Sequence, residues 1–418
     1  MTVTTTERSS AYARVLRQRA MPSMLVSHGA GTIAQQVVVL AVGAYVLQRT
    51  GSPIWTAVTV ALGYVPYLLL SARAGVQVDR YSRVAVLRCS ALVRIAVTAV
   101  LAAAMLADWA APVIVLLTAL TAVAATPAYP ALAAGAVQCV DDADLPTANA
   151  LATGVENIAW LIGPGVLGGL LLLGYGPTEA VVAAAVLFVV AWFALFRVGL
   201  PRAVPEAADD VGEGLLPVLR SLRALPQVRS PLLLAVVDNL LYGYLVVALV
   251  LLAAVDGPGS EHRLGLLNAA LSAGALASLL VVNHLAHRRR ARLTLVLLLC
   301  VFAGCIVLLG LAGFSVLGLA VVAIAGVATI VAEVLCVTQV QRATPSAWHG
   351  RVLGVYDTLA VGSVALGSLL AGLAVGALGA QAATASAGVI GLVLVLVSLR
   401  LPDVPGTTEG GEGQPLLP

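Results

Sequence analysis

The stretch GVQVDRYSR (Gly75–Arg83) lies between two long apolar runs and carries three charged side chains within nine residues. Charged residues make up only 10% of the 418-residue chain and hydrophobic residues 60%, whereas a typical soluble domain is about half apolar and about a quarter charged. This apolar surplus cannot be buried in one water-soluble core. We therefore expect a membrane protein, in which Gly75–Arg83 is a short charged loop between two membrane spans.

Outward from this loop, the chain contains twelve apolar runs that can cross a hydrocarbon layer, which takes about 20 helical residues. Only helices and closed barrels satisfy every backbone group in lipid, and these runs lack the alternation of barrel strands. The sequence therefore predicts an all-α integral membrane protein with twelve transmembrane helices. The predicted spans are residues 22–48, 54–73, 84–107, 111–137, 147–173, 177–198, 230–254, 264–285, 292–312, 314–341, 351–377 and 381–400.

The arginines predict the orientation of these spans. All 23 basic residues are arginine, and twenty of them lie in or beside cytoplasmic segments if the N-terminus is cytoplasmic. Arg49 and Arg263 would lie outside the cell, and Arg94 lies within the third span. Because positively charged loops are retained in the cytoplasm, we expect both termini to be cytoplasmic and the protein to reside in the plasma membrane.

The chain divides into two six-span halves. We expect an N-terminal bundle (1–198), a cytoplasmic linker with a short amphipathic helix (199–229), a C-terminal bundle (230–400) and a disordered cytoplasmic tail (401–418). The second loop of each half is basic, and the fifth span of each half begins with a polar segment followed by glycines, at an offset of a little over two hundred residues. Six-plus-six repeats of this kind are typical of transporters that bind substrate between the repeats.

A family resemblance rests on these motifs taken in order. The stretch GVQVDRYSRVAV resembles the signature loop of the major facilitator superfamily, Gly-x-x-x-Asp-Arg-x-small-Arg. The stretches GSPIWTAVTVALGYVPYLLLSARAGVQVDR, ANALATGVENIAWLIGPGVLGGLL and HGRVLGVYDTLAVGSVALGSLLAG resemble the branch that contains macrolide efflux proteins and enterobactin exporters. The resemblance covers nearly the whole chain and implies the major facilitator fold, with two pseudo-symmetric six-helix bundles.

The resemblance implies a gating role for the signature loop, formed here by Gly75, Asp79, Arg80 and Arg83. In the family, its aspartate is thought to engage the start of the eleventh span when the cavity faces outward. A carboxylate is favoured at a helix N-terminus, and Arg351 near the start of that span is a second partner for Asp79. The alternative is that Arg80 and Arg83 only anchor the topology.

Two proline motifs interrupt apolar runs. GPGVLGG in the fifth span resembles the glycine-proline motif of exporters, with a helix bend predicted at Gly163, Pro164, Gly168 and Gly169; one extra residue separates its glycine pairs, and close packing is the alternative. TPAYP (Thr126–Pro130) predicts irregular backbone in the fourth span.

Ionisable groups inside a membrane are costly and mark functional sites by default. They are Arg94 in span three, Glu156 in span five, Asp238 in span seven, Glu333 in span ten and Asp357 in span eleven. Each lies seven to ten residues from the cytoplasmic end of its predicted span, about 10–15 Å into the helix. In the functional interpretation the acids bind protons or substrate; in the structural one they pair with Arg94 or accept helix hydrogen bonds. We expect Arg94 to be structural.

Further polar residues are predicted to line a cavity. They are Gln35 and Gln36 in span one, Asn239 and Tyr242 beside Asp238, Asn268 in span eight and Gln339 in span ten. His28 lies near the predicted start of span one, where it would face headgroups. For each of these, an ordinary hydrogen bond between helices is the alternative.

The residue inventory excludes several activities. Without lysine there is no P-loop and no Schiff-base site, and the five cysteines lack zinc-type spacing. We expect no enzyme activity, cofactor, metal or nucleic acid, and partners limited to a small-molecule substrate, protons and membrane lipids, with the monomer as the working unit. The predicted function is proton-coupled efflux of an amphipathic drug, antibiotic or siderophore-like metabolite. An uptake symporter, and a lipid-handling or non-transporting membrane protein, are the alternatives.

Overall fold

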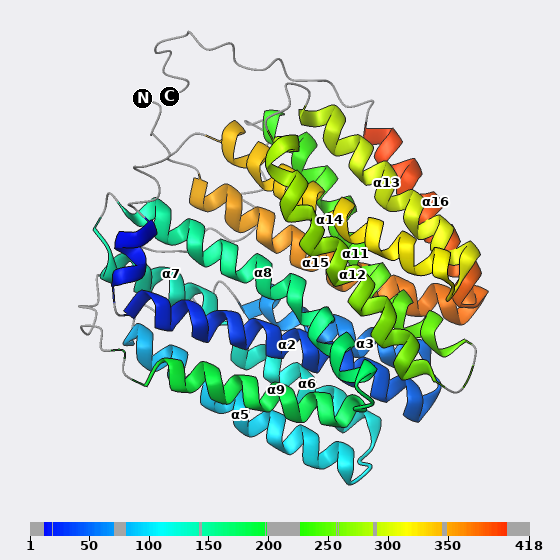
Figure 1. Ribbon diagram of the computed structural model, residues 1–418, viewed down its shortest axis with the longest axis horizontal. Helices are drawn as coiled ribbons and strands as arrows, with labels where there is room; N and C mark the ends of the chain where they lie inside the picture. The colour runs from blue at the N-terminus through cyan, green and yellow to red at the C-terminus, as the bar shows by residue number, and fades with distance from the viewer. Residues whose placement is uncertain are drawn as a thin grey trace.

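The computed structural model describes residues 12–18, 20–70, 81–141, 144–196, 198, 226–255, 257, 259–286, 291–344 and 349–398 (Figure 1). Twelve stretches of helix within these residues are long and apolar enough to cross a membrane. The helices are α2 (Ala20–Thr50), α3 (Pro53–Leu62), α5 (Arg83–Leu106), α6 (Ala111–Ala125), α7 (Ala128–Cys139), α8 (Leu145–Leu172), α9 (Pro177–Ala194), α11 (Pro226–Ala254), α12 (Ser260–Ala286), α13 (Ala291–Ala312), α14 (Val316–Ala343), α15 (His349–Leu378) and α16 (Ala380–Ser398).

These spans confirm the predicted all-helical architecture and differ from the predicted runs mainly at their ends. The second span continues from α3 to Leu70. The fourth is divided between α6 and α7, so the TPAYP motif does interrupt the helix, at Thr126–Pro127. The seventh span begins at Pro226, within the predicted linker 199–229. The remainder of that linker, the predicted tail 401–418 and residues 71–80, which include 75–80 of the signature loop, lie outside the described residues.

The packing of the helices repeats between the two halves. In the N-terminal half α2 packs on α8 and α9, and α5 packs on α6 and α9. In the C-terminal half α11 packs on α15 and α16, and α13 packs on α14 and α16. The halves meet through α3 against α15 and α8 against α12. Because these two contacts join the second span of one half to the fifth span of the other, they are images of each other under the pseudo-two-fold relation of the bundles.

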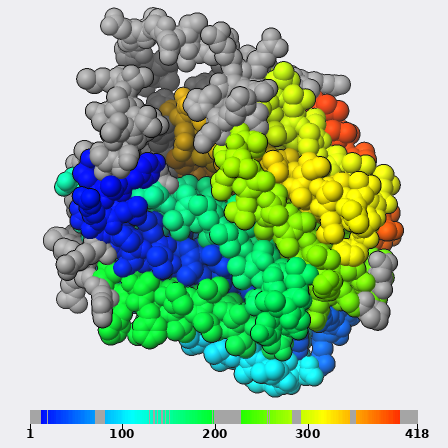
Figure 2. All heavy atoms as spheres, viewed as in Figure 1, coloured from blue at the N-terminus to red at the C-terminus, as the bar shows by residue number. Residues whose placement is uncertain are grey.

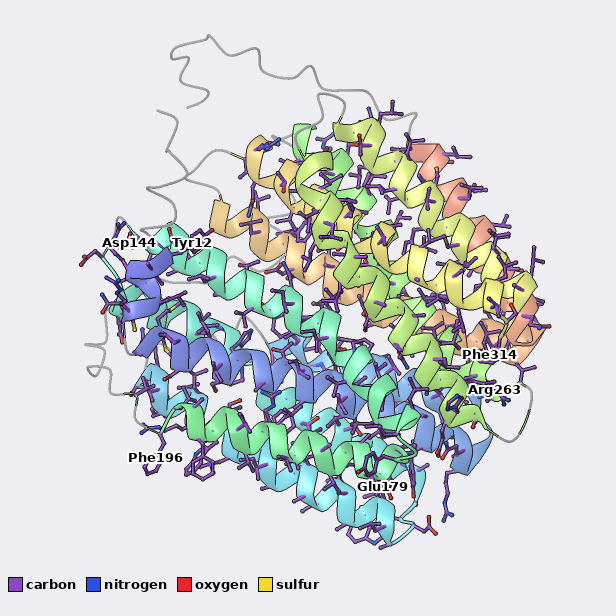
Figure 3. The ribbon with its side chains drawn as sticks, in the orientation of Figure 1. Tyr12, Asp144, Glu179, Phe196, Arg263 and Phe314 are labelled. Atoms are coloured by element: carbon purple, nitrogen blue, oxygen red, sulfur yellow. The ribbon has the colours of Figure 1, made fainter. Side chains whose placement is uncertain are left out.

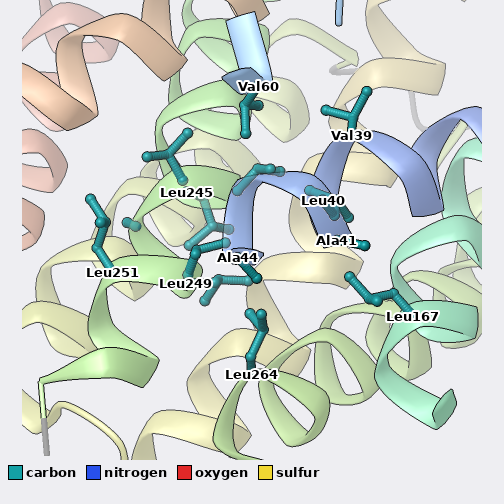
Figure 4. Packing of buried hydrophobic residues seen from close by; sticks show 14 of the residues in the cluster. Val39, Leu40, Ala41, Ala44, Val60, Leu167, Leu245, Leu249, Leu251 and Leu264 are labelled. Atoms are coloured by element: carbon teal, nitrogen blue, oxygen red, sulfur yellow. The ribbon is translucent and has the colours of Figure 1, made fainter. Parts of the chain in front are cut away.

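The hydrophobic core joins the two halves on only one side of the membrane. We call the side where α2, α8 and α15 begin the near side, and the side where they end the far side. Figure 4 shows the far-side core, in which Val39 and Leu167 of the N-terminal half pack with Leu245 and Leu264 of the C-terminal half. Toward the near side the core splits into two clusters, each built from one half only.

Small residues allow the halves to approach closely on the far side. A Cβ atom placed on Gly168 of α8 would lie 2.7 Å from the Gly265 carbonyl oxygen and 2.9 Å from the Ala269 nitrogen, both on α12. Ser272 of α12 donates a hydrogen bond of 2.9 Å to the Leu161 carbonyl oxygen of α8. At the symmetry-related contact, a Cβ on Gly372 of α15 would lie 2.8 Å from the Pro53 carbonyl oxygen of α3. The far side is therefore closed by backbone-to-backbone packing.

The near-side parts of α8 and α15 are open. A Cβ atom on Gly154 of α8 or Gly354 of α15 would meet no atom within 4 Å, whereas one on Gly168 or Gly372 would meet the other half; on the far side Gly169 and Gly376 also have open space. Asn157 on α8 and Asp357 on α15 are exposed. Figure 2 shows the surface hollowed between the two halves, with the orange atoms of α15 recessed between them. The structure therefore has a cleft that opens toward the near side.

A segment preceding α2 belongs to the near-side core of the N-terminal half. Val15 is fully buried there, and the Arg14 guanidinium donates to both carboxylate oxygens of Asp144, at 2.9 and 2.6 Å. These hydrogen bonds hold the pKa of Asp144 below its usual range. Asp144 immediately precedes α8 and is labelled on this side in Figure 3, opposite Arg263 and Phe314. The ion pair thus fixes the N-terminal segment to the start of α8.

We predict that Gly168→Val opens the far side. The new side chain must push α8 away from the α12 backbone, and overpacking of this kind costs about 1–3 kcal/mol. The closed-to-open equilibrium constant should fall roughly fivefold or more, and the open population should rise accordingly, because about 1.4 kcal/mol corresponds to a tenfold change in an equilibrium constant. The measurement is labelling of a Ser272→Cys reporter by an impermeant maleimide from the far side, in a background without the five native cysteines.

Gly169→Val is the matched control, because a Cβ at Gly169 meets nothing within 4 Å. Equal labelling of the reporter in the Gly168 and Gly169 variants would show that this packing does not keep the far side closed.

Candidate functional site

A hydrogen-bonded polar cluster lies inside the C-terminal half. Thr329 of α14 donates to Oδ1 of Asp238 on α11 at 3.0 Å. Asn239, the next residue of α11, donates through Nδ2 to Oε2 of Glu333 on α14 at 3.0 Å, and Tyr356 of α15 donates to Oε1 of Glu333 at 2.7 Å. Three helices of one bundle therefore converge on two carboxyl groups.

Helix geometry explains why these residues meet. Thr329 and Glu333 are four residues apart on α14, so both side chains project from one face. That face meets α11, where Asp238 is 2% exposed. Because α11 begins at Pro226 rather than at residue 230, Asp238 lies about 18 Å along its helix at about 1.5 Å per residue, deeper than the sequence predicted.

Two further carboxyl groups lie in the cleft between the halves. Glu156 on α8 belongs to the N-terminal half, and its side chain is 27% exposed. Asp357 on α15 belongs to the C-terminal half, is exposed, and is close enough to Glu156 and Glu333 to interact with both electrostatically. Asp357 therefore lies between the buried cluster of its own half and the acid of the opposite half.

The sequence predicted that His28 faces the lipid headgroups, but the structure places it inside the N-terminal half. It is buried in α2, and its Nε2 atom lies 3.8 Å from Oε2 of Glu156. The neighbouring Gly29 allows this approach, because a Cβ there would lie 2.9 Å from a methyl carbon of Val155. The headgroup prediction was wrong because α2 begins at Ala20 and lies against α8 along this stretch, so His28 is already inside the bundle.

An aromatic pair, Tyr64 and Trp160, lies near Glu156 and was not predicted from the sequence. The rings of Tyr64 and Trp160 stack with centroids 5.5 Å apart, and the Tyr64 hydroxyl donates to Oε1 of Gln36 at 3.3 Å. Trp160 is four residues after Glu156 on α8, so the two share a helix face. A tryptophan in an apolar run is ordinary, and only the packing of α8 against the second span reveals the pair.

Arg94 contributes its charge to packing inside the N-terminal half. The side chain is buried, donates through Nη2 to the Gly31 carbonyl oxygen of α2, and lies with its guanidinium carbon 4.1 Å from the centroid of the Phe188 ring of α9. A guanidinium over an aromatic face is a favourable cation–π contact. The arrangement joins α2, α5 and α9, which favours a structural role for Arg94.

The other predicted polar residues have varied surroundings. Gln35 donates to the Thr121 hydroxyl of α6 at 3.1 Å. Asn268 donates to the Leu264 carbonyl oxygen of its own helix at 3.1 Å. Tyr242 is near enough to Asp238 for the two side chains to interact electrostatically. Gln339 is half-buried on α14, toward the near side.

Part of the predicted gating loop can be placed. Arg83 begins α5 and donates to the Tyr81 carbonyl oxygen at 3.2 Å. Gly75, Asp79, Arg80 and the side chain of Arg351 lie outside the described residues. Among the described residues, no group of three or more histidine, cysteine or acidic side chains could hold a metal ion.

The glycine-proline motif lies within a continuous helix. α8 runs from Leu145 to Leu172 through Pro164. A Cβ on Gly163 would lie 2.4 Å from the Gln36 Cβ of α2, and Gly168 contacts the α12 backbone, whereas Gly169 has nothing within 4 Å. These contacts favour the packing interpretation at Gly163 and Gly168.

Twelve spanning helices in two matched bundles, with carboxyl groups in a one-sided cleft between them, define a multi-pass membrane protein of the secondary-transporter type. The family model of the Major Facilitator Superfamily matches residues 24–368 and 260–418. The chain belongs to this superfamily and is a transporter rather than an enzyme.

Named relatives agree with this assignment. The chain is 31% identical to enterobactin exporter EntS of Shigella boydii and of Escherichia coli over 260 residues, which cover 62% of this chain and 61% of each relative. It thus spans about three fifths of their length. The crystal structure of the nucleoside transporter NupG aligns with a TM-score of 0.71 at 10% identity, covering 91% of this chain and 98% of that one. A POT family transporter in complex with a thioalcohol-conjugated peptide aligns with a TM-score of 0.67 at 11% identity, over 91% and 95% of the chains.

We predict that Arg94→Lys lowers thermal stability without removing coupling. Lysine cannot reproduce the planar contact with Phe188 together with the hydrogen bond to Gly31, and an unsatisfied buried group costs about 1–3 kcal/mol. The melting temperature of the purified protein should fall by a few degrees, while Arg17→Lys at an exposed position should leave it unchanged. A variant of normal stability that had lost its response to a pH gradient would instead place Arg94 in the coupling machinery.

Proposed function

We propose that this transporter exports an amphipathic small molecule in exchange for protons by alternating access. The observation that carries the proposal is the position of the acids: Glu156 and Asp357 come from opposite halves and face one cleft, which is open on the near side and closed on the far side. The similarity to an enterobactin exporter supports the outward direction.

We place the near side in the cytoplasm and the protein in the plasma membrane. The loops on the near side carry most of the arginines, and positive loops remain cytoplasmic. Both termini are then cytoplasmic, and the described state is inward-open. This is the state in which an exporter takes up its substrate.

The cleft favours hydrophobic or cationic compounds. Its described lining combines the partly exposed Trp160, which is backed by the buried Tyr64, with the carboxyl groups of Glu156 and Asp357, while Arg94 is buried against Phe188. A ring of the substrate can pack beside Trp160 while an attached cationic group approaches the acids from either half. Release of such a molecule on the far side would require the packing of α8 on α12 to separate.

Coupling follows from competition for the acids. A proton or a cation neutralises the cleft carboxyl groups, and burying an uncompensated charge is costly. If the transporter passes through its closed states only when these carboxyl groups are neutral, it must carry either a proton or a cationic substrate on each passage. It therefore exchanges protons for substrate. An uptake symporter would instead have to bind the proton and the substrate together, and the relative's printed activity favours export.

We predict that an imposed pH gradient accelerates transport of ethidium, used as an aromatic cationic probe, by the purified full-length chain in proteoliposomes. Acidifying the compartment that faces the far side should raise the rate several-fold, because protons drive the return of the neutralised cleft. Equal rates with and without the gradient would exclude tight proton coupling.

We predict that Glu156→Gln weakens the probe's interaction with the cleft. Loss of a charged contact worth about 1.5–3 kcal/mol should raise the half-saturation concentration about tenfold or more. Glu179→Gln at the far-side start of α9 is the matched control, because glutamine can still accept the Gly176 amide hydrogen bond seen there at 2.9 Å. Unchanged half-saturation in the Glu156 variant would remove this acid from the substrate path.

We also propose that the signature loop closes the near side in the outward-facing state, with Asp79 engaging the start of α15 and Arg351. We predict that Asp79→Asn abolishes ethidium transport in the same proteoliposomes, because the neutral amide loses the attraction to the helix terminus, worth about 0.3–1 kcal/mol and up to about 2 when partly buried, and to the arginine. Membrane insertion, measured by yield in the membrane fraction, should not change. Wild-type transport by this variant would contradict the latch.

A further inference from the structure

We propose that Asp238 and Glu333 share a single proton in the described state, with the proton on Asp238 and the negative charge on Glu333. The inference deepens the proposed function, since it assigns the proton to one named carboxyl group of the C-terminal half. It rests on the hydrogen bonds and burial of the two groups.

The hydrogen bonds of Glu333 fit a carboxylate. Oε2 accepts from Nδ2 of Asn239 at 3.0 Å, and Oε1 accepts from the hydroxyl of Tyr356 at 2.7 Å. The amide nitrogen can only donate, and the tyrosine hydroxyl is the shorter and therefore stronger contact. A proton on Oε2 would face an amide nitrogen that cannot accept it, and Oε1 accepts the hydroxyl hydrogen of Tyr356. Donors to both oxygens stabilise the ionised form.

The surroundings of Asp238 fit a carboxylic acid. The residue is 2% exposed, and its described hydrogen bond is the one from Thr329 to Oδ1, at 3.0 Å. This bond leaves Oδ2 available to hold a proton while Oδ1 accepts as a carbonyl oxygen. An ionised group with one neutral donor in such a site would be poorly compensated. A second negative charge beside Glu333 would raise that cost further.

The groups that face Asp238 do not supply a compensating cation. From α14 they are Glu333 and Cys336, from α15 Tyr356, and from α11 itself Tyr242. All are neutral or negative in their ordinary states. Because none of these described neighbours is a cation, the negative charge of Asp238 can be neutralised within this set only by a proton.

The cluster also has a connection to the cleft. Tyr356, which holds Glu333, is followed on α15 by Asp357, which is exposed and interacts electrostatically with both Glu333 and Glu156. A proton leaving Oδ2 of Asp238 can be taken up by the Glu333 carboxylate and passed to water in the cleft, which leaves one fewer proton and one more negative charge in the pair. A cation bound at Glu156 and Asp357 would favour that release.

The test is infrared spectroscopy of the purified full-length protein in lipid nanodiscs, which needs no substrate. The wild type at neutral pH should show the carbonyl stretch of a buried protonated carboxylic acid, and the band should disappear on alkaline titration. Asp238→Asn should abolish the band, whereas Glu333→Gln should retain it. Loss of the band in Glu333→Gln with its retention in Asp238→Asn, or retention in both, would overturn the assignment.

A second pair of variants keeps the test decisive if Asp238→Asn fails to fold. Thr329→Val removes the donor to Oδ1 and should move the band to higher frequency without removing it, because the carbonyl loses its hydrogen bond. Tyr356→Phe removes a donor from Glu333 and should shift part of the acid signal to a second band. An unmoved band in Thr329→Val would show that the protonated group is not Asp238.

Asp108→Asn is the matched control for an aspartate-to-asparagine change. Asp108 is exposed on the far side and has φ of 53°, a conformation that asparagine adopts readily, so its band should match the wild type. Asp357→Asn and Glu156→Gln test the two cleft acids, and loss of the band in either variant would also overturn the proposal. Failure of the pH gradient to drive ethidium would refute proton coupling while leaving the infrared assignment standing, so the two failures are distinguishable.

Discussion

The close packing of α8 against α12 on the far side is the constraint on which the rest of the structure depends. In lipid there is no hydrophobic effect to drive helices together, so association depends on how closely backbones can approach. Gly168 faces the backbone of Gly265 and Ala269, and the symmetry-related Gly372 faces that of α3. On the far side the two halves therefore share one continuous hydrophobic core. Because the near-side cores stay separate, this packing also decides which carboxyl groups are open to the cleft.

The charges are distributed accordingly. The Arg94 guanidinium contacts the Gly31 carbonyl oxygen and the Phe188 ring, and among the described residues it forms no ion pair with an acid. Glu333 is held by two donors inside the C-terminal bundle, whereas Asp357, on the helix that supplies one of those donors, is exposed. The cleft therefore presents carboxyl groups, while the bundle interior keeps its own acids hydrogen-bonded. On α15 the donor to Glu333, Tyr356, and the exposed Asp357 are consecutive residues, so one helix contacts both the buried cluster and the cleft.

The features that the bilayer imposes, the spans and the rare charged residues within them, could be predicted from the sequence. The side-chain contacts that depend on how the helices pack could not. Twelve spans could be predicted because hydrocarbon thickness sets run length, and acids such as Asp238 were evident because charge is rare in apolar runs. The partners of these acids could not be predicted, since Thr329 and Tyr356 are ordinary residues until α11, α14 and α15 meet. His28 was misplaced for the same reason: the distance of a residue from the end of a run says nothing about the helix it faces.

The pseudo-symmetry of the halves sharpens the role of the C-terminal cluster. In the N-terminal half, Gln35 of the first span donates to Thr121 of the fourth span at 3.1 Å; in the C-terminal half, Asp238 of the seventh span accepts from Thr329 of the tenth span at 3.0 Å. The two pairs lie at the sequence offset that relates the halves, a little over two hundred residues. An amide cannot gain or lose a proton in the physiological range, whereas a carboxyl group can. Of two otherwise matching contacts between spans, only the C-terminal one can therefore change its charge during a transport cycle.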